Sequence, residues 1–309
     1  MGLQESAKTI ISTCMGVRKG ERAVIIIDTS KENIGQALFE AAKEVKAEPV
    51  LVKILPTKAD NEEPPAAVAE AMKHADVIIA ATEFSLTHTE ARKAATRSGA
   101  RIAALPGITE EIFESLSADF EEIEKRIKKI YWAVRNCRKI EIETKLGTYV
   151  TLSTDGRKWV TEDTGICRER SKLTNLPAGE IFIAPNEGSA NGTLIVDGSF
   201  GKKLQNPLRI IVKDGFAESE NEEAEKLLTK KGKLGRAVGE FGIGLNPKAK
   251  IIGFPLQDKK ALGTCHLSFG DNFAFGGKIK CGAQAVAVIK EPTVKVDGRV
   301  ILEEGKLVI

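Results

Sequence analysis

The hydrophobic periodicity of this chain changes near residue 138, and this change restricts its fold more than any other feature. In the first half, continuous apolar runs alternate with segments that have apolar residues at helical spacing. A run without polar alternation is typical of a parallel strand buried on both faces. This βαβα order predicts an α/β fold with a doubly wound, mainly parallel sheet. The four runs span residues 23–28, 49–54, 77–81 and 101–106.

The second half has short alternating segments that are separated by turn residues such as Gly147 and the Asp155-Gly156 pair. We expect a β-rich domain there, with one helix at 218–232 and a long helix from Asp119 to about Cys137 before it. The predicted domains are 1–137, an α/β domain with this linking helix, and 138–309, a β-rich domain. The strands expected after residue 178 span 179–185, 192–198, 208–215, 249–255, 285–290, 293–298 and 299–309.

Composition excludes several classes of protein. The 309 residues carry 46 Lys and Arg against 43 Asp and Glu, and the two signs are interspersed, so no nucleic-acid-binding surface is indicated. No apolar run is long enough to span a bilayer, and the first twenty residues lack a signal-peptide core, which predicts a cytoplasmic protein without a membrane partner. The five cysteines include no CxxC pair, so we expect free thiols.

Only three histidines are available for chemistry. His74 ends a predicted helix, where it suits the helix dipole. His88 follows the third predicted strand, and ligands of open α/β sheets bind at the carboxyl ends of strands. His88 is therefore a candidate catalytic residue that could shuttle protons, with Arg92 holding a ligand carboxylate. An exposed turn histidine, with Thr89 capping the next helix, is the alternative interpretation.

His266 lies in a polar segment bounded by glycines, which we interpret as a loop, and a histidine there is a candidate metal ligand. Carboxylates are natural partners for such a metal. Glu180 follows a Pro-Ala-Gly turn. Glu240 stands in an apolar, glycine-rich stretch where a charge needs a partner or a metal. A structural, fully paired carboxylate is the alternative for each glutamate.

These residues lie in motifs that resemble two related families. The segments NLPAGEIFIAP, VGEFGIGLNP and GTCHLSFGDN, followed by a glycine pair and EPTVKVDG, are similar to metallo-aminopeptidases of the aminopeptidase T and S type. They are also similar to 2,5-dihydroxypyridine ring-cleaving dioxygenases. The first-half segments SLTHTEAR and SGARIAALPGIT resemble relatives described as leucyl aminopeptidase-like, and the similarity spans nearly the whole chain.

The resemblance implies a two-domain homodimer with a two-metal site made by two glutamates, two histidines and an aspartate. It places the glutamates at Glu180 and Glu240 and the first histidine at His266. The second histidine and the aspartate belong to an HxD motif, whose positions carry Gln284 and Val286 here. Valine cannot bind a metal, so the expected ligand set is incomplete. A dioxygenase would need two histidines and an aspartate for iron.

We therefore expect a metal-dependent hydrolase with a reduced site, acting on a small-molecule or peptide substrate. In it, Glu180, Glu240 and His266 bind one divalent metal, with zinc favoured over cobalt or iron, since three protein ligands and a water suffice for catalytic zinc. In a second interpretation Cys281, rather than Cys265, replaces a lost ligand. Two alternatives remain: a non-enzymatic homologue that keeps the fold and the dimer and binds a small ligand in the cleft between the domains, and a relative of the iron dioxygenases.

Overall fold

The structure is a computed structural model that describes residues 2–309. The described chain forms two compact units. The first contains residues 2–122 and Gly165–Ala178, and the second contains Ile123–Thr164 and Gly179–Ile309. The chain therefore passes between the units three times, after residues 122, 164 and 178. Helix α6 (Phe120–Val134), which the sequence predicts as a link, lies almost wholly in the second unit.

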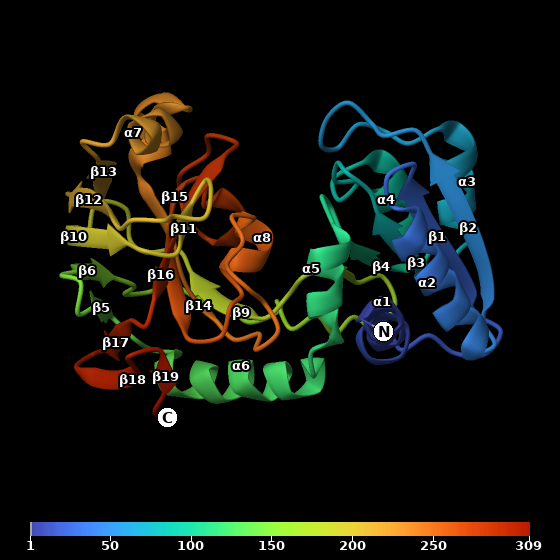
Figure 1. Ribbon diagram of the computed structural model, residues 1–309, viewed down its shortest axis with the longest axis horizontal. Helices are drawn as coiled ribbons and strands as arrows, with labels where there is room; N and C mark the ends of the chain where they lie inside the picture. The colour runs from blue at the N-terminus through green and yellow to red at the C-terminus, as the bar shows by residue number, and fades with distance from the viewer. Residues whose placement is uncertain (1) are drawn as a thin grey trace. The chain divides into compact units, whose positions relative to one another are not determined.

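The first unit is built around a fully parallel five-stranded sheet with the order β2-β1-β3-β4-β8 (Figure 1). Its strands are β1 (Arg22–Asp28), β2 (Glu48–Ile54), β3 (Val77–Ala81), β4 (Arg101–Ala104) and β8 (Leu173–Asn175). Its helical segments are α1 (Gly2–Lys8), η1 (Thr9–Cys14), α2 (Glu32–Glu44), α3 (Ala66–Lys73), α4 (Glu90–Arg97), α5 (Glu110–Glu114) and η2 (Ser115–Ser117). The first four strands are the predicted apolar runs. Burial of the side chains of β1, β3 and β4 forms the core of this unit, whereas in the edge strand β2 only Ile54 is buried.

The second unit holds two antiparallel sheets. The eight-stranded sheet has the order β13-β12-β10-β6-β5-β17-β18-β19. These strands are Phe216–Glu218, Leu208–Lys213, Asn191–Val196, Tyr149–Ser153, Lys139–Glu143, Thr293–Val296, Arg299–Glu303 and Lys306–Leu307. The six-stranded sheet has the order β11-β16-β15-β14-β9-β7, with strands Ser199–Phe200, Gln284–Lys290, Thr264–Gly270, Val238–Gly244, Glu180–Ile183 and Trp159–Val160. The helical segments are α7 (Glu222–Thr229), η3 (Gly232–Arg236), α8 (Pro255–Asp258) and η4 (Phe273–Phe275).

This architecture confirms the predicted fold class, a parallel α/β sheet combined with a β-rich second half. Two local predictions are wrong. Residues 249–255 form no strand; they lead into α8, and Asp258 accepts the backbone N–H groups of Ile252 and Gly253. The segment around His266 is not a loop but the buried strand β15. None of the helices formed by residues 2–309 is both long and apolar enough to cross a membrane.

Candidate metal centre

Three adjacent strands of the six-stranded sheet bring Glu180, Glu240 and His266 to one face. Glu180 opens β9 and pairs with Gly244 of β14, while His266 of β15 pairs with Gly242. Alternate residues of a strand point to the same face, so Glu240, Gly242 and Gly244 share one face of β14. Paired residues also share a face, and the two glutamates and the histidine therefore converge although they lie far apart in sequence.

Two glycines of β14 make room on this face. A Cβ atom on Gly242 would come within 2.2 Å of His266 Cε1, so the imidazole lies directly over the bare backbone. A Cβ atom on Gly244 would come within 2.2 Å of the carbonyl oxygen of Ala261. Gly242 therefore leaves space for the histidine ring, and Gly244 allows the segment after α8 to approach the backbone of β14 closely.

The segment after α8 carries two lysines into the site. Asn246 fixes its backbone, because its N–H donates to the carbonyl of Lys260 and its carbonyl accepts from Leu262 N–H. Lys259 Nζ lies 2.9 Å from Glu180 Oε1 and 3.2 Å from Glu240 Oε1. Lys260 Nζ lies 2.6 Å from Glu180 Oε1 and 2.6 Å from Asp163 Oδ2. Three carboxylates are thus paired with two ammonium groups.

The remaining contacts join the histidine to the carboxylates. His266 Nε2 lies 2.9 Å from Glu240 Oε1 and 3.5 Å from Glu180 Oε2. The hydroxyl of Ser268 donates to Glu240 Oε1 at 3.2 Å. The side chains of Glu180, Glu240 and His266 are at most 2% exposed, whereas Lys259 keeps 12% exposure. Within this cluster of Asp163, both glutamates, both lysines and His266, Lys259 is therefore partly open to solvent whereas the triad is not.

Burial alone would raise the pKa of Glu180 and of Glu240, since it disfavours the charged carboxylate. The ammonium of Lys259 and the contact with His266 outweigh burial, and both pKa values lie below the ordinary 4.5. Burial alone would lower the pKa of Lys259, but the two glutamates raise it above 10.5. All three groups are therefore charged at neutral pH.

The geometry of the three predicted ligands resembles that of a metal site. One ligand atom from each of Glu180, Glu240 and His266 lies within 4.8 Å of the other two, so the three form a candidate metal-binding triad. Glu180 Oε2 is buried and has no hydrogen-bond partner among the described residues. This oxygen is free to accept a bond from a metal or from a donor group of a ligand.

Other features of the site do not fit a bound metal. An imidazole that binds a metal through Nε2 carries its proton on Nδ1 and needs an acceptor there. His266 Nδ1 is buried, and no hydrogen-bond partner for it exists within residues 2–309. Both carboxylates already contact the ammonium of Lys259, and an ammonium close to a dication would be strongly repelled. The carboxylates are already paired with ammonium groups, and the imidazole lacks the acceptor that a metal ligand needs. The residues present therefore do not fit the metal that the resemblance implies.

The positions of the missing HxD motif face the same cluster. Gln284 Nε2 lies 3.4 Å from Glu240 Oε2 and donates to the carbonyl of Asp271 at 2.6 Å. Val286 pairs with Ser268, which itself contacts Glu240. A histidine and an aspartate at these positions would therefore lie beside the triad, which gives the resemblance a structural basis.

The other candidate residues are not members of the triad. His88 belongs to the first unit, is exposed, and bonds through its backbone N–H to Asn61. Arg92 donates to the carbonyl of Thr87. A catalytic role for His88 stays a prediction. Neither Cys265 nor Cys281 belongs to the ligand group that residues 2–309 form, and Cys265 is fully buried next to His266 in the strand.

Four residues of the site cannot be recognised from the sequence: Lys259, Lys260, Asp163 and Ser268. Consecutive lysines in LQDKKALG are typical of a solvated surface, and no spacing links them to distant glutamates. The only available signal was Glu240 itself, because a charge in an apolar stretch requires a partner. That partner is supplied by lysine rather than by a metal.

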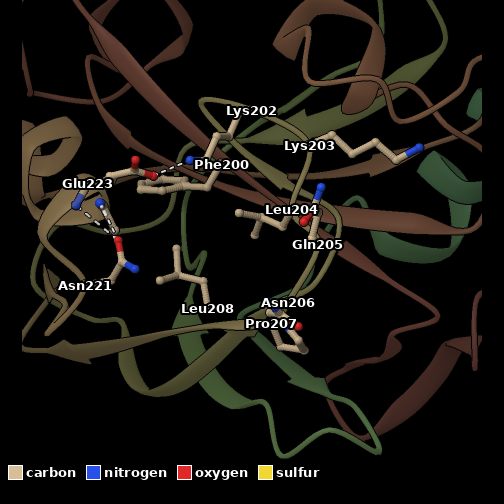
Figure 2. Close-up of a pocket in the computed structure, with 11 residues that line it drawn as sticks. Phe200, Lys202, Lys203, Leu204, Gln205, Asn206, Pro207, Leu208, Asn221 and Glu223 are labelled. Carbon is tan, nitrogen blue, oxygen red and sulfur yellow. Dashed lines mark hydrogen bonds and ion pairs between the residues drawn. The ribbon is translucent and has the colours of Figure 1, made fainter.

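A partly exposed aromatic pair adjoins the cluster. Lys259 Nζ lies 5.4 Å from the centroid of the Phe182 ring. Phe275 meets Phe182 edge to face, with centroids 5.3 Å apart. By contrast, the cavity in Figure 2, of about 430 Å³, is lined by residues such as Phe200, Leu208 and Asn221 and contains none of the triad.

Comparison with known proteins connects this chain to one family. Residues 3–309 match the family described as 2,5-dihydroxypyridine 5,6-dioxygenase. The protein of that name from Pseudomonas putida is 22% identical over 262 residues, which cover 78% of this chain and 73% of the relative. The solved structure of 2,5-dihydroxypyridine dioxygenase from Pseudomonas putida KT2440 has a TM-score of 0.76 at 18% identity, covering 99% of this chain and 96% of that one.

AmpT from Thermus thermophilus is also similar in structure, with a TM-score of 0.70 at 16% identity and coverage of 100% and 99% of the two chains. At these identities the structural likenesses show a shared fold. The resemblance to both families that the motifs indicate is confirmed. The comparisons favour the dioxygenase alternative, and the expectation of a hydrolase is not confirmed by them.

Proposed function

We propose that this chain, which belongs to the 2,5-dihydroxypyridine 5,6-dioxygenase family, binds a small hydroxylated aromatic molecule but does not cleave it by metal-dependent chemistry. The observation that carries the proposal is the contact of one ammonium, that of Lys259, with both carboxylates of the candidate triad. A lysine in this place leaves the site polar and ordered without a metal.

The groups beside Lys259 suit a flat ring with hydroxyl or N–H donors. Phe182 and Phe275 offer aromatic surface next to the ammonium, and aromatic pairs favour edge-on or offset contact with a further ring. Glu180 Oε2 has no hydrogen-bond partner among residues 2–309 and can accept a bond from a ligand hydroxyl. The named substrate of the relatives, a dihydroxypyridine, has this chemistry.

In this proposal the chain's own residues have distinct roles. Lys259 and Lys260 hold Glu180 ionised, which makes it a strong acceptor. Ser268 and His266 hold Glu240 in place beneath Lys259. The aromatic pair would orient the ring and exclude water from one of its faces.

An iron-dependent ring-cleaving dioxygenase is the second candidate function. The family match over residues 3–309 and the convergence of the candidate triad favour it. It would require the metal to displace Lys259 and to bind with His266 as the single histidine ligand. The hydrolase with one zinc, which the sequence analysis favours, meets the same obstacle, although zinc is the metal that such a three-ligand set suits best.

One titration and one assay separate these functions. Calorimetric titration of the purified protein with 2,5-dihydroxypyridine under nitrogen measures binding, and we expect a saturable signal with a Kd between about 1 μM and 1 mM. Phe182→Ala should weaken this binding. Phe273→Ala should not, because it removes an exposed phenylalanine of η4, the short helix that also contains Phe275.

The assay then measures loss of the pyridine absorbance in air with added Fe(II). We expect no loss above the protein-free control. Turnover at enzymatic rates would establish the second candidate instead. Absence of binding in the titration would remove the ring-binding proposal.

A further inference from the structure

The ammonium of Lys259 contacts one carboxylate oxygen of each glutamate of the triad. We infer that Lys259 is a built-in cation that closes this site to divalent metals, and that removing its charge converts the cluster into a metal site. The inference deepens the proposed function and rests on its assignment of the site, but it makes no use of ring binding.

The first argument is spatial. Lys259 Nζ contacts Glu180 Oε1 at 2.9 Å and Glu240 Oε1 at 3.2 Å, from two different strands. A zinc ion bonds carboxylate oxygens at about 2.0–2.2 Å and imidazole nitrogen at about 2.0–2.1 Å. An ion bound through the two Oε1 atoms would lie between oxygens that the ammonium already bridges. An ion bound through the Oε2 atoms of the same carboxylates would lie close to that ammonium and be repelled by it. The two cations therefore compete for this site.

The second argument is the charge of the cluster. Glu180 and Glu240 contribute two negative charges and Lys259 contributes one positive charge, so these three groups sum to −1. Burial raises the pKa of Asp163, and this carboxyl is left out of the sum together with Lys260, which contacts it. Adding a dication would bring the three groups to +1. Without the Lys259 charge the two glutamates have −2, and a dication brings them to zero. Buried charge is tolerated when it is compensated. A chain that lacks the charge of Lys259 should therefore bind the dication, whereas the natural chain should not.

The third argument concerns how firmly Lys259 is held. Its neighbour Asp258 accepts the N–H groups of Ile252 and Gly253, and the carbonyl of Lys260 accepts from Asn246. Its backbone is therefore fixed over the sheet. For the ammonium to leave, it would have to break contacts with two buried carboxylates at once.

The test compares Lys259→Met, which keeps the length of the side chain and removes its charge, with Lys259→Arg, which keeps the charge. Lys202→Met serves as a matched control, because it removes a lysine from the surface ion pair with Glu223 in the same unit. Each protein is treated with a chelator, dialysed, and titrated with zinc by calorimetry. Bound zinc is measured by elemental analysis, and cobalt(II) is added to record the visible spectrum of the bound ion.

We expect wild type, Lys259→Arg and Lys202→Met to retain less than about a tenth of an equivalent of zinc. Lys259→Met should bind about one equivalent, with an affinity at least 10-fold above wild type, the lower end of the change produced by a single residue next to a metal. Zinc should also raise the melting temperature of Lys259→Met alone.

A wild-type protein that holds about one equivalent of zinc after dialysis would overturn the inference, as would a folded Lys259→Met that binds no better than wild type. If Lys259→Met folds only when zinc is present, the inference is supported, because the metal then replaces the lost cation. If it folds in neither condition, the wild-type zinc content alone decides. The 2,5-dihydroxypyridine titration is a separate measurement, so failure of ring binding leaves these outcomes intact.

Discussion

The imidazole of His266 lies over the backbone of Gly242, so closely that a Cβ atom at Gly242 would come within 2.2 Å of the ring. The ring position in turn sets the contact of His266 Nε2 with Glu240. A glycine without a side chain is therefore a part of the site.

Gly242→Ala should force the ring away from Glu240. We expect a loss of about 1–3 kcal/mol in the free energy of unfolding, the usual effect of an added methyl group in a packed core. Denaturation in urea measures it. In a His266→Ala background the same methyl group fills the space of the lost ring, so its effect should shrink or reverse. An equal loss in both backgrounds would contradict this explanation.

Glu180→Gln should destabilise the second unit, because it leaves Lys259 and Lys260 with less compensating charge in a buried place. Breaking a buried pair by removing one partner typically reduces stability by about 3–5 kcal/mol. Glu223→Gln removes the carboxylate of the exposed pair with Lys202 and serves as the control, with a melting temperature close to that of wild type. Similar effects of the two variants would show that the cluster does not stabilise the fold.

The stability of the protein should depend on pH through the same carboxylates. The pKa values of Glu180 and Glu240 lie below 4.5 in the folded chain, so the unfolded chain takes up protons first as pH falls. Their contribution is fully present above about pH 4.5 and is lost progressively below it. The difference in melting temperature between wild type and Glu180→Gln should therefore be large at pH 7 and should decrease as the pH is lowered towards 3. A constant difference would argue against charged carboxylates.

Restoring the HxD motif with Gln284→His and Val286→Asp should not by itself create a tight metal site. Both positions face the cluster, but Lys259 still bridges Glu180 and Glu240. Combined with Lys259→Met, the two changes should raise zinc affinity beyond that of Lys259→Met alone, and calorimetry measures the difference. Tight zinc binding by the double variant with Lys259 intact would show that the lysine is no barrier.

Aminopeptidase turnover on leucine amides should be weak or absent, since a two-metal hydrolase needs ligands that Gln284 and Val286 do not supply. Release of leucine from leucine amide, with zinc or cobalt added, is the measurement. Turnover near 10 per second, an ordinary enzymatic rate, would be incompatible with this expectation.

Periodicity predicts the parallel sheet well, because residues such as Ile25 and Ile79 lie in continuous apolar runs that only buried strands require. Strand β8 could not be found in this way. Its three residues are too few to show a period, and it pairs with β4, which lies about seventy residues earlier in the chain.

Glu240 could be selected from sequence because its charge stands out against apolar, glycine-rich neighbours. Glu180 and His266 are candidates mainly through the motifs that carry the family resemblance. The sequence around His266 predicts a loop rather than a strand, because Thr264 and Ser268 are polar, yet both are buried in β15. Lys259 was beyond reach for a different reason. Its role depends on a turn that places it over β14, and no local pattern encodes that long-range contact.

The three crossings of the chain between its units restrict how the protein can be divided. Segment Gly165–Ala178 supplies β8, the outermost strand on one edge of the parallel sheet, although the residues on either side of it belong to the other unit. A fragment that ends at residue 122 would leave the edge of β4 without its partner, and unpaired edges promote aggregation. No single cut in the chain therefore separates the two units, because the first is complete only after residue 178, when part of the second has already been made.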